Sequence, residues 1–179
     1  MSTSDETQFE PASSPALVIR QAKQQDASAI WEFVRHEPSL DTNSCYAYLL
    51  LCSDFAETCL VASLGDRLVG FVVGYIPPNR PDAVFVWQIG IAQEMRGRGL
   101  ARRLLEQLLR GKSDRGLCHL EATITPGNKP SWRLFQSLAD SLDCPLTTVN
   151  GFAADDFGGD QHEAEQLIRI GPIKEMLCR

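Results

Sequence analysis

The stretch from Val84 to Leu105 constrains the fold of this chain more than any other. A run rich in β-forming residues, AVFVWQIGI, precedes a basic, glycine-rich turn. An apolar pattern at helical spacing follows that turn, at Leu100, Leu104, Leu105 and Leu108. This order predicts a buried strand, a tight turn and an amphipathic helix that opens at Gly99.

The turn at 96–99 has the chemistry of a phosphate site. The first amides of a helix have no internal partners and lie at the positive end of its dipole. Glycines let a phosphate approach that backbone closely, and Arg96 and Arg98 add positive charge. The P-loop pattern G-x-x-x-x-G-K-[ST] is absent, and Arg102 stands where a dinucleotide-binding motif needs its third glycine. The turn therefore predicts a site for a pyrophosphate that is neither a P-loop nor a dinucleotide-binding motif.

Other runs predict the remaining elements of the fold. Strand-like runs lie at 17–20, 58–64, 68–75, 117–125, 145–149 and 166–170, and helical patterns begin after Asp26, Ser44, Gly99 and Asn128. Helices that lie between strands favour a mixed α/β sheet with helices on both faces. Gly90 interrupts the long strand, which indicates a bulge or a close approach to the backbone.

Length and composition suit one globular domain: 179 residues, 44% of them hydrophobic and 22% charged. We expect a disordered tail at residues 1–16 and a single domain at 17–179. The net charge of −6 argues against nucleic acids and anionic membranes as partners. Because neither a secretory signal nor a membrane-spanning run is present, we expect a cytoplasmic protein. Its six cysteines are then expected to be reduced thiols, and no residues have the spacing of a metal site.

Arg96, Gly99 and Ala101 form the pattern R-x-x-G-x-A, which follows the long strand and precedes another strand and an Asn-led helix. In this setting the chain resembles the GCN5-related N-acetyltransferase (GNAT) superfamily, from about Leu17 to Ile170. The resemblance implies the acyl-CoA N-acyltransferase fold, an α/β fold whose mixed sheet of six to seven strands is flanked by about four helices. It also implies acetyl-CoA as co-substrate, held by Ile89, Gly90, Ile91, Arg96, Gly97, Arg98, Gly99, Leu100, Ala101, Asn128 and Ser131.

Four further segments are similar to the L-2,4-diaminobutyrate acetyltransferases of ectoine biosynthesis, a family within that superfamily. They are LDTNSCYAYLLLC at 40–52, FVWQ at 85–88, EATIT at 121–125 and the run at 162–172. This resemblance implies that an acetyl group passes from acetyl-CoA to the γ-amine of diaminobutyrate, by direct attack and without a covalent enzyme intermediate. It also implies a homodimer.

Acetylation of an amine requires a proton acceptor, because a protonated alkylamine, with a pKa of about 10, is not a nucleophile. Many superfamily members have a Glu base at the position of Gln88 and a Tyr acid at that of Phe135, and neither residue here can replace them. We therefore expect Glu121, on the next strand, to be the base, directly or through water, with Tyr46 as the candidate acid. Backbone amides around Ile89 to Ile91 are expected to stabilise the oxyanion.

A diamino acid also needs a carboxylate for its second ammonium group, and Asp41 and Glu121 are the candidates. Without the resemblance, the L-D-T-N-S sequence would favour a turn or capping role for Asp41. The family pattern makes Trp87 a wall of the substrate pocket, on the strand face opposite Gln88, rather than a core residue. Thr123 shares a strand face with Glu121 and is expected to line the same pocket.

His162 lies in a late loop from which it could reach the substrate, although a loop histidine is more often solvated. Two other functions stay open. One is acetylation of another small amine or of a peptide, and the other is a non-catalytic acyl-CoA sensor, because the usual Glu and Tyr are both absent. Asp41 and the Glu121–Thr123 pair favour an enzyme, since a sensor needs no amine pocket.

Overall fold

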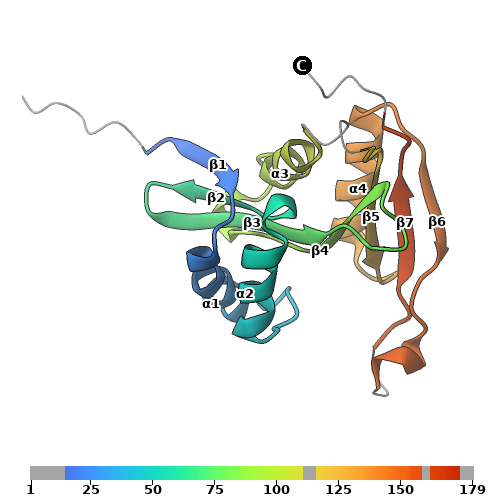
Figure 1. The fold of residues 1–179 in the computed structure, drawn as a ribbon, viewed down its shortest axis with the longest axis horizontal. Helices are drawn as coiled ribbons and strands as arrows, with labels where there is room; N and C mark the ends of the chain where they lie inside the picture. Colours follow the sequence, from blue (N-terminus) through green and yellow to red (C-terminus); the bar gives the residue numbers. More distant parts are fainter. Residues whose placement is uncertain (1–14, 111–115, 159–161, 174–179) are drawn as a thin grey trace, which may run out of the picture.

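One mixed sheet of seven strands runs through the computed structural model, which describes residues 15–110, 116–158 and 162–173 (Figure 1). Its strand order is β1-β2-β3-β4-β5-β7-β6. The strands are β1 (Leu17–Gln21), β2 (Leu60–Leu64), β3 (Arg67–Tyr75), β4 (Ala83–Ile91), β5 (His119–Ile124), β6 (Leu146–Asn150) and β7 (Gln166–Ile170). The predicted mixed sheet is therefore confirmed, whereas the predicted tail lies outside the described residues except for positions 15 and 16.

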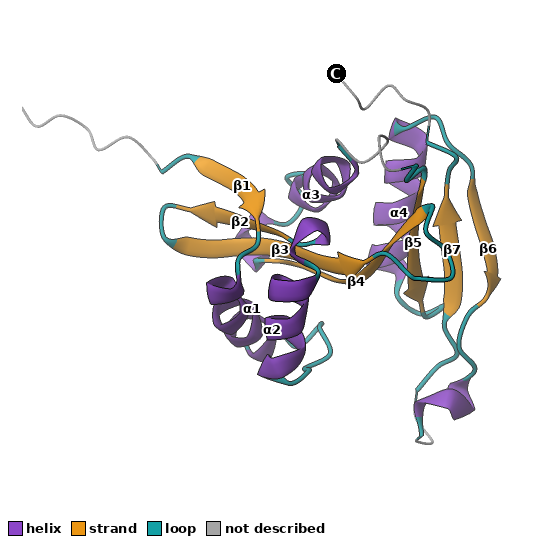
Figure 2. Cartoon of the chain, viewed as in Figure 1, coloured by secondary structure: helices purple, strands orange, loops and turns teal. Residues whose placement is uncertain are grey.

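Four α-helices of the described chain cover the two faces of this sheet (Figure 2). They are α1 (Ala27–Arg35), α2 (Cys45–Asp54), α3 (Leu100–Leu109) and α4 (Lys129–Ser141). One hydrophobic core lies between the sheet and α3 and α4, and it contains the predicted leucines of α3. A second core lies between the sheet and α1 and α2. No helix in the described ranges is long and apolar enough to cross a membrane.

The helix starts follow the predicted capping residues with one exception. Ser44 Oγ accepts a hydrogen bond from the Ala47 amide (3.3 Å) at the start of α2, and Asn128 caps α4 in the same way. Asp26 precedes α1, but its carboxylate accepts hydrogen bonds from the Arg20 guanidinium (2.7 and 2.8 Å) and the Lys23 amide (2.7 Å). The Arg20 bonds hold the pKa of Asp26 below its usual value. Asp26 thus ties β1 to the turn before α1 instead of capping the helix.

The strands β4 and β5 diverge near the middle of the sheet. They pair in parallel over Ala83–Phe85 and His119–Glu121 only. Beyond Phe85, β4 continues along β3 to Ile91, while β5 continues along β7 (Figure 1). The edge of β4 that faces β5 therefore has no strand partner over residues 86–91 in the described chain. We call this divergence, between residues 86–91 of β4 and 122–124 of β5, the fork.

A β-bulge at Trp87 changes which way the side chains of β4 point. Val73 and Gly74, which are adjacent in β3, pair with Gln88 and Val86. Trp87 lies between these two pairs and has no partner in β3. An extra residue of this kind shifts the alternation of side chains by one. Val86 lies in the core under α3, whereas Trp87 and Gln88 both contact Tyr48 of α2. The prediction that Trp87 and Gln88 lie on opposite faces is therefore wrong.

Gly90 allows side chains to approach the strand closely, which is one of the two predicted reasons for a glycine there. A Cβ at this position would lie 2.5 Å from Cε1 of Phe71, 2.9 Å from Cδ1 of Leu40 and 3.1 Å from Cε1 of Phe33. The bulge, the other predicted reason, is at Trp87 instead. The missing side chain lets α1 and the loop after it pack directly onto β4.

Gly74→Ala should destabilise the strand pair that carries the bulge. A Cβ at Gly74 would lie 2.3 Å from the carbonyl oxygen of Phe85, a backbone atom that cannot rotate away. We expect a loss of about 1–3 kcal/mol in the free energy of unfolding, measured by urea denaturation. Gly70→Ala in the same strand is the matched control, because its shortest contact is 2.9 Å to the flexible tip of Ile91. Equal losses in both variants would contradict this explanation.

Candidate active site

The turn between β4 and α3 presents free backbone amides. Gly97 and Gly99 have positive φ angles of 71° and 74°, which glycine adopts at little cost. A Cβ at either position would meet nothing within 4 Å, so the backbone conformation, and not crowding, requires glycine. Within the described residues, no acceptor engages the amides of Gly97, Arg98, Gly99, Leu100 and Ala101. These amides are the donors that a phosphate group needs.

The two predicted arginines of this turn have different surroundings. Arg96 Nη2 lies 2.6 Å from Glu37 Oε2, and its Nε donates to the Ile91 carbonyl (3.1 Å). The Arg96 hydrogen bond holds the pKa of Glu37 below its usual value. Arg98 is exposed, and in the described part of the chain its charge acts only on Glu94, without a hydrogen bond or close ion pair. Arg96 therefore shapes the turn, while the charge of Arg98 is available to a ligand.

A second helix N-terminus lies at the same end of the sheet. Because β4 and β5 are parallel, α3 and α4 both begin beyond the carboxyl ends of their preceding strands. Asn128 Oδ1 accepts from the Ser131 amide (3.2 Å), as the cap of α4. The Gly127 amide donates to Glu163 Oε2 (3.2 Å), which ties the late loop to this helix start. The predicted cofactor residues on β4, α3 and α4 are thus gathered around the fork.

The open edge of β4 presents two amides to the fork. Adjacent residues of an antiparallel pair alternate between bonding their partner and pointing away. The Ala92 amide bonds Val69 of β3 (2.9 Å), so the amides of Ile89 and Ile91 point to the opposite edge, toward β5. Ile89, predicted as an oxyanion donor, therefore has its N–H on the side where an acyl group would enter the fork.

A chain of hydrogen bonds holds the loop that carries Asp41. The Tyr48 hydroxyl donates to Gln88 Oε1 (2.8 Å), and Gln88 Nε2 donates to the Asp41 carbonyl oxygen (2.9 Å). Trp31 Nε1 donates to the Asn43 carbonyl oxygen (3.1 Å) in the same loop. Burial raises the pKa of Tyr48, so its hydroxyl keeps its proton and remains a donor at neutral pH. The backbone of Asp41 is thereby held next to the bulge, and its side chain is exposed.

Glu121 is fully buried, and both of its carboxylate oxygens are occupied. Oε2 lies 2.7 Å from Arg80 Nε, and Oε1 accepts from Arg169 Nη1. Arg169 also bonds Asp82 through Nη2. Thr123 is half-buried two residues further on the same strand, as predicted. Each oxygen of Glu121 is already held by a guanidinium, and the whole side chain is shielded from solvent, which argues against its predicted role as base.

The two remaining predicted residues lie apart from these groups. Tyr46 is 66% exposed on the outer side of α2. The His162 ring stacks on Phe157, with centroids 3.7 Å apart, and its Nδ1 lies 2.7 Å from the Glu163 carbonyl oxygen. Among described residues, no hydrogen bond or ring contact joins His162 to Asp41 or to the other predicted substrate residues. Their predicted roles gain no support from these contacts.

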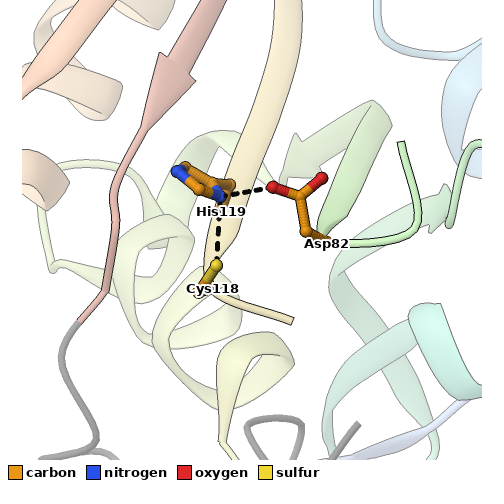
Figure 3. Close-up of side chains that lie close together, drawn as sticks. All are labelled: Asp82, Cys118 and His119. Atoms are coloured by element: carbon orange, nitrogen blue, oxygen red, sulfur yellow. Dashed lines mark hydrogen bonds and ion pairs between the residues drawn. The ribbon is translucent and has the colours of Figure 1, made fainter. Parts of the chain in front are cut away.

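Asp82, Cys118 and His119 bring three potential metal ligands together (Figure 3). His119 Nδ1 lies 2.9 Å from Asp82 Oδ2 and 3.2 Å from Cys118 Sγ. The same Asp82 oxygen is bound by Arg169, whose positive charge opposes a second cation. The group is therefore explained by its own hydrogen bonds and ion pairs, and the absence of a functional metal stays a prediction.

Comparisons with known proteins identify the family. Residues 18–139 match the profile of the Acetyltransferase (GNAT) family. Over 157 residues the chain is 45% identical to the L-2,4-diaminobutyric acid acetyltransferase of Halalkalibacterium halodurans, covering 88% of this chain and 82% of that protein. The protein of the same name from Halomonas elongata is 45% identical over 159 residues, with 88% and 82% covered. The chain belongs to the diaminobutyrate acetyltransferase family of GNAT proteins.

A solved structure of this family has the same fold. The diaminobutyrate acetyltransferase EctA from Paenibacillus lautus has a TM-score of 0.83 at 36% identity, covering 89% of this chain and 97% of that one. That protein was solved in complex with its substrate L-2,4-diaminobutyric acid and coenzyme A. Ard1 from Thermoplasma volcanium, with a TM-score of 0.68 at 14% identity, shares the fold alone. The resemblance inferred from the sequence is thus confirmed for the family and for the fold.

Three residues of the site are absent from the predictions. Nothing in the apolar pattern of α2 singles out Tyr48, because that helix is apolar nearly all round. Arg169 does carry a signal, since a charge between apolar residues of a strand requires a buried partner. Arg80 lies in a proline-rich loop, and only the fold brings it to Glu121.

Tyr48→Phe should loosen the loop at 38–43 while the family fold persists. The variant keeps the ring against Trp87 but loses the hydroxyl that orients Gln88. We expect the free energy of unfolding to fall by only about 1 kcal/mol and hydrogen–deuterium exchange to rise in this loop. Tyr46→Phe, on the exposed side of the same helix, is the matched control and should not change the exchange. If the loop of Tyr48→Phe exchanged as slowly as that of the wild type, contacts other than those of Gln88 would hold the loop.

Proposed function

We propose that this protein transfers the acetyl group of acetyl-CoA to the γ-amine of L-2,4-diaminobutyrate, giving N4-acetyl-L-2,4-diaminobutyrate. The observation that carries the proposal is the fork, an unpaired strand edge between two helix N-termini, in a chain 45% identical to relatives of that name. A family member binds both the diamino acid and coenzyme A. We assign the reaction to ectoine synthesis, the pathway to which the sequence resemblance points.

The free amides and the open strand edge support a binding mode for acetyl-CoA. Its pyrophosphate would accept hydrogen bonds from the turn at 97–101, with Arg98 adding charge. The pantetheine arm, which carries amide groups, would pair with the open edge of β4 at Ile89 and Ile91, as an added strand does. The N-terminal residues of α4, Asn128 and Ser131, would bound the other side. The thioester carbonyl would then lie near the Ile89 amide, the proposed oxyanion donor.

The same arrangement supports direct attack by the amine. Asp41 is exposed beside Trp87 and Gln88, and it is the proposed partner of the non-reacting ammonium group. The γ-nitrogen would form a bond to the thioester carbon and lose a proton, and the coenzyme A thiolate would leave and take one up. No covalent intermediate on the enzyme is required, since the amine itself is the nucleophile.

The ion pairs of Glu121 decide the choice of proton acceptor. Glu121, acting directly or through water, is the candidate that the sequence offers, but Arg80 and Arg169 occupy both of its oxygens. We therefore favour water in the fork as the first proton acceptor. Tyr46 stays the proposed acid for the leaving thiolate, and His162 stays a proposed substrate contact.

Two broader properties belong to the same proposal. The family resemblance supports a homodimer in the cytoplasm, where small metabolites such as acetyl-CoA are used. Exposed apolar side chains at the end of α2 offer a surface for the second copy: Leu50 on the helix and Phe55 directly after it. A nucleic acid or a membrane is not a proposed partner.

A non-catalytic acyl-CoA sensor is the second candidate function. It is favoured by Gln88 and Phe135, which stand where superfamily members have Glu and Tyr, and by the ion pairs of Glu121. Such a protein would use the turn at 97–101 in the same way but would need no amine pocket. Turnover distinguishes the two candidates.

The first experiment is an amine panel with acetyl-CoA. Thiol release should be fast with L-2,4-diaminobutyrate and at least about tenfold slower with ornithine, lysine and a peptide amine, since one misplaced methylene costs about 1–3 kcal/mol. NMR of the product should show acetylation of the γ-nitrogen. Acetyl-CoA binding without thiol release from any amine would support the sensor. Faster turnover of ornithine, lysine or the peptide would redirect the substrate assignment.

Arg98→Ala and Arg96→Ala should weaken acetyl-CoA binding to different degrees. Arg98→Ala should raise KM for acetyl-CoA about two- to fivefold, an effect that added salt suppresses because the side chain is exposed. Arg96→Ala should raise it about tenfold or more, since two bonds that shape the turn are lost. Steady-state kinetics at two salt concentrations measures both. A KM that neither substitution changes would remove this turn from the cofactor site.

A further inference from the structure

The ion-paired cluster around Glu121 lies on the substrate side of the sheet. Glu121 pairs in register with Phe85, the last residue of β4 before the fork opens. Phe85 and Trp87 are two residues apart on β4, so both point away from the core under α3 and α4. Glu121 and Arg169, which face each other across β5 and β7, point to that side as well. The cluster is thus the charged neighbour of the proposed pocket wall.

Arg169 and Arg80 both bind Glu121, but they differ in the donors that they have left. Arg169 uses one terminal nitrogen for Glu121 and the other for Asp82. Arg80 uses Nε for Glu121 (2.7 Å), and its Nη1 makes one long contact of 3.4 Å with Asn79 Oδ1. Its side chain is 34% exposed, whereas Glu121 is completely buried. A guanidinium has five N–H donors, so Arg80 holds a fixed position with donors to spare.

The substrate has one group that no residue yet accounts for. L-2,4-diaminobutyrate carries a carboxylate beside its α-ammonium group, and the proposed site offers Asp41 to the ammonium alone. Guanidinium is the side chain best suited to a carboxylate, because its planar fork donates two parallel hydrogen bonds. Arg169 already bridges two carboxylates in this cluster. Arg80 would do the same with Glu121 on one side and the substrate on the other.

We propose that Arg80 binds the α-carboxylate of the substrate and thereby distinguishes a diamino acid from a simple diamine. Glu121 then acts as a positioning residue, whose buried charge fixes the Arg80 guanidinium beside the Phe85–Glu121 pair at which the fork begins. The two charged groups on the α-carbon of the substrate would each meet an opposite charge, the ammonium at Asp41 from the loop after α1 and the carboxylate at Arg80 from the loop between β3 and β4. This inference rests on the proposed function and adds a specificity-determining residue to it.

The test compares L-2,4-diaminobutyrate with 1,3-diaminopropane, which keeps both amines and lacks the carboxylate. For wild type we expect kcat/KM to be about 10- to 100-fold higher for the diamino acid, the range of a charged hydrogen bond. Arg80→Gln keeps a donor for Glu121 but loses the charge, and it should reduce this ratio to within about threefold of unity, through KM for the diamino acid. Arg80→Lys, which keeps the charge without the fork, should give an intermediate ratio. Arg110→Gln, at an exposed arginine at the far end of α3, is the control and should keep the wild-type ratio.

The outcomes distinguish a failure of the proposed role of Arg80 from a failure of the proposed function. The ratio is taken on one preparation, so a variant that is partly unfolded changes both rates alike and leaves the ratio intact. A wild-type ratio in Arg80→Gln would overturn the role of Arg80 and leave the acetyltransferase standing. The role of Arg80 would also be overturned if Arg80→Gln acetylated neither amine while Arg80→Lys kept the wild-type ratio. Position 80 would then need only a positive charge that balances Glu121. Wild-type protein that acetylates neither amine would overturn the proposed function itself.

Discussion

The unpaired edge of β4 is the constraint on which the rest of the structure depends. An exposed strand edge carries free N–H and C=O groups, and sheets usually pair or cover them. Here β5 pairs with β4 over three residues and with β7 over five, so the two parallel strands diverge. The parallel pairing also puts the first turns of α3 and α4 at the same end of the sheet. The open edge and the start of α3 therefore present unsatisfied donors at one end of the sheet, and α4 begins beside them with its first amides already bonded within its own cap.

The bulge and the hydrogen bonds of Gln88 require each other. In a regular strand, Gln88 would share a face with Val86 and would place a polar amide in the core under α3 and α4, where a buried donor without a partner costs about 1–3 kcal/mol. The bulge at Trp87 turns this amide to the other face, and the buried Tyr48 hydroxyl and the Asp41 carbonyl satisfy it there. A side chain at the position of the usual base thus becomes the tie that holds a loop.

Local patterns in the sequence predict the fold well, because the period of apolar residues decides which segments become strands and helices. The bounds of β4 and β7 agree with the predicted runs, and the glycine turn and Asn128 cap are local features as well. The bulge escapes such reasoning, since it depends on how β3 lies against β4, with Gly74 close to the Phe85 carbonyl. The partners of Glu121 escape it for the same reason, because Arg80 and Arg169 are 41 and 48 residues away along the chain. Which residue types form a site is visible in the sequence, but which of their atoms remain free is not.

The loop at 37–44 connects the two halves of the site. Arg96, which begins the turn proposed to bind the pyrophosphate, pairs with Glu37 at one end of this loop. Gln88, on the strand that would bind the pantetheine arm, holds the Asp41 carbonyl near its other end. The loop that carries Asp41 is therefore anchored on the same two elements that would bind acetyl-CoA. A shift of the turn would therefore move Glu37, and a shift of the strand would move Asp41, so the proposed cofactor site and the proposed amine site share one loop.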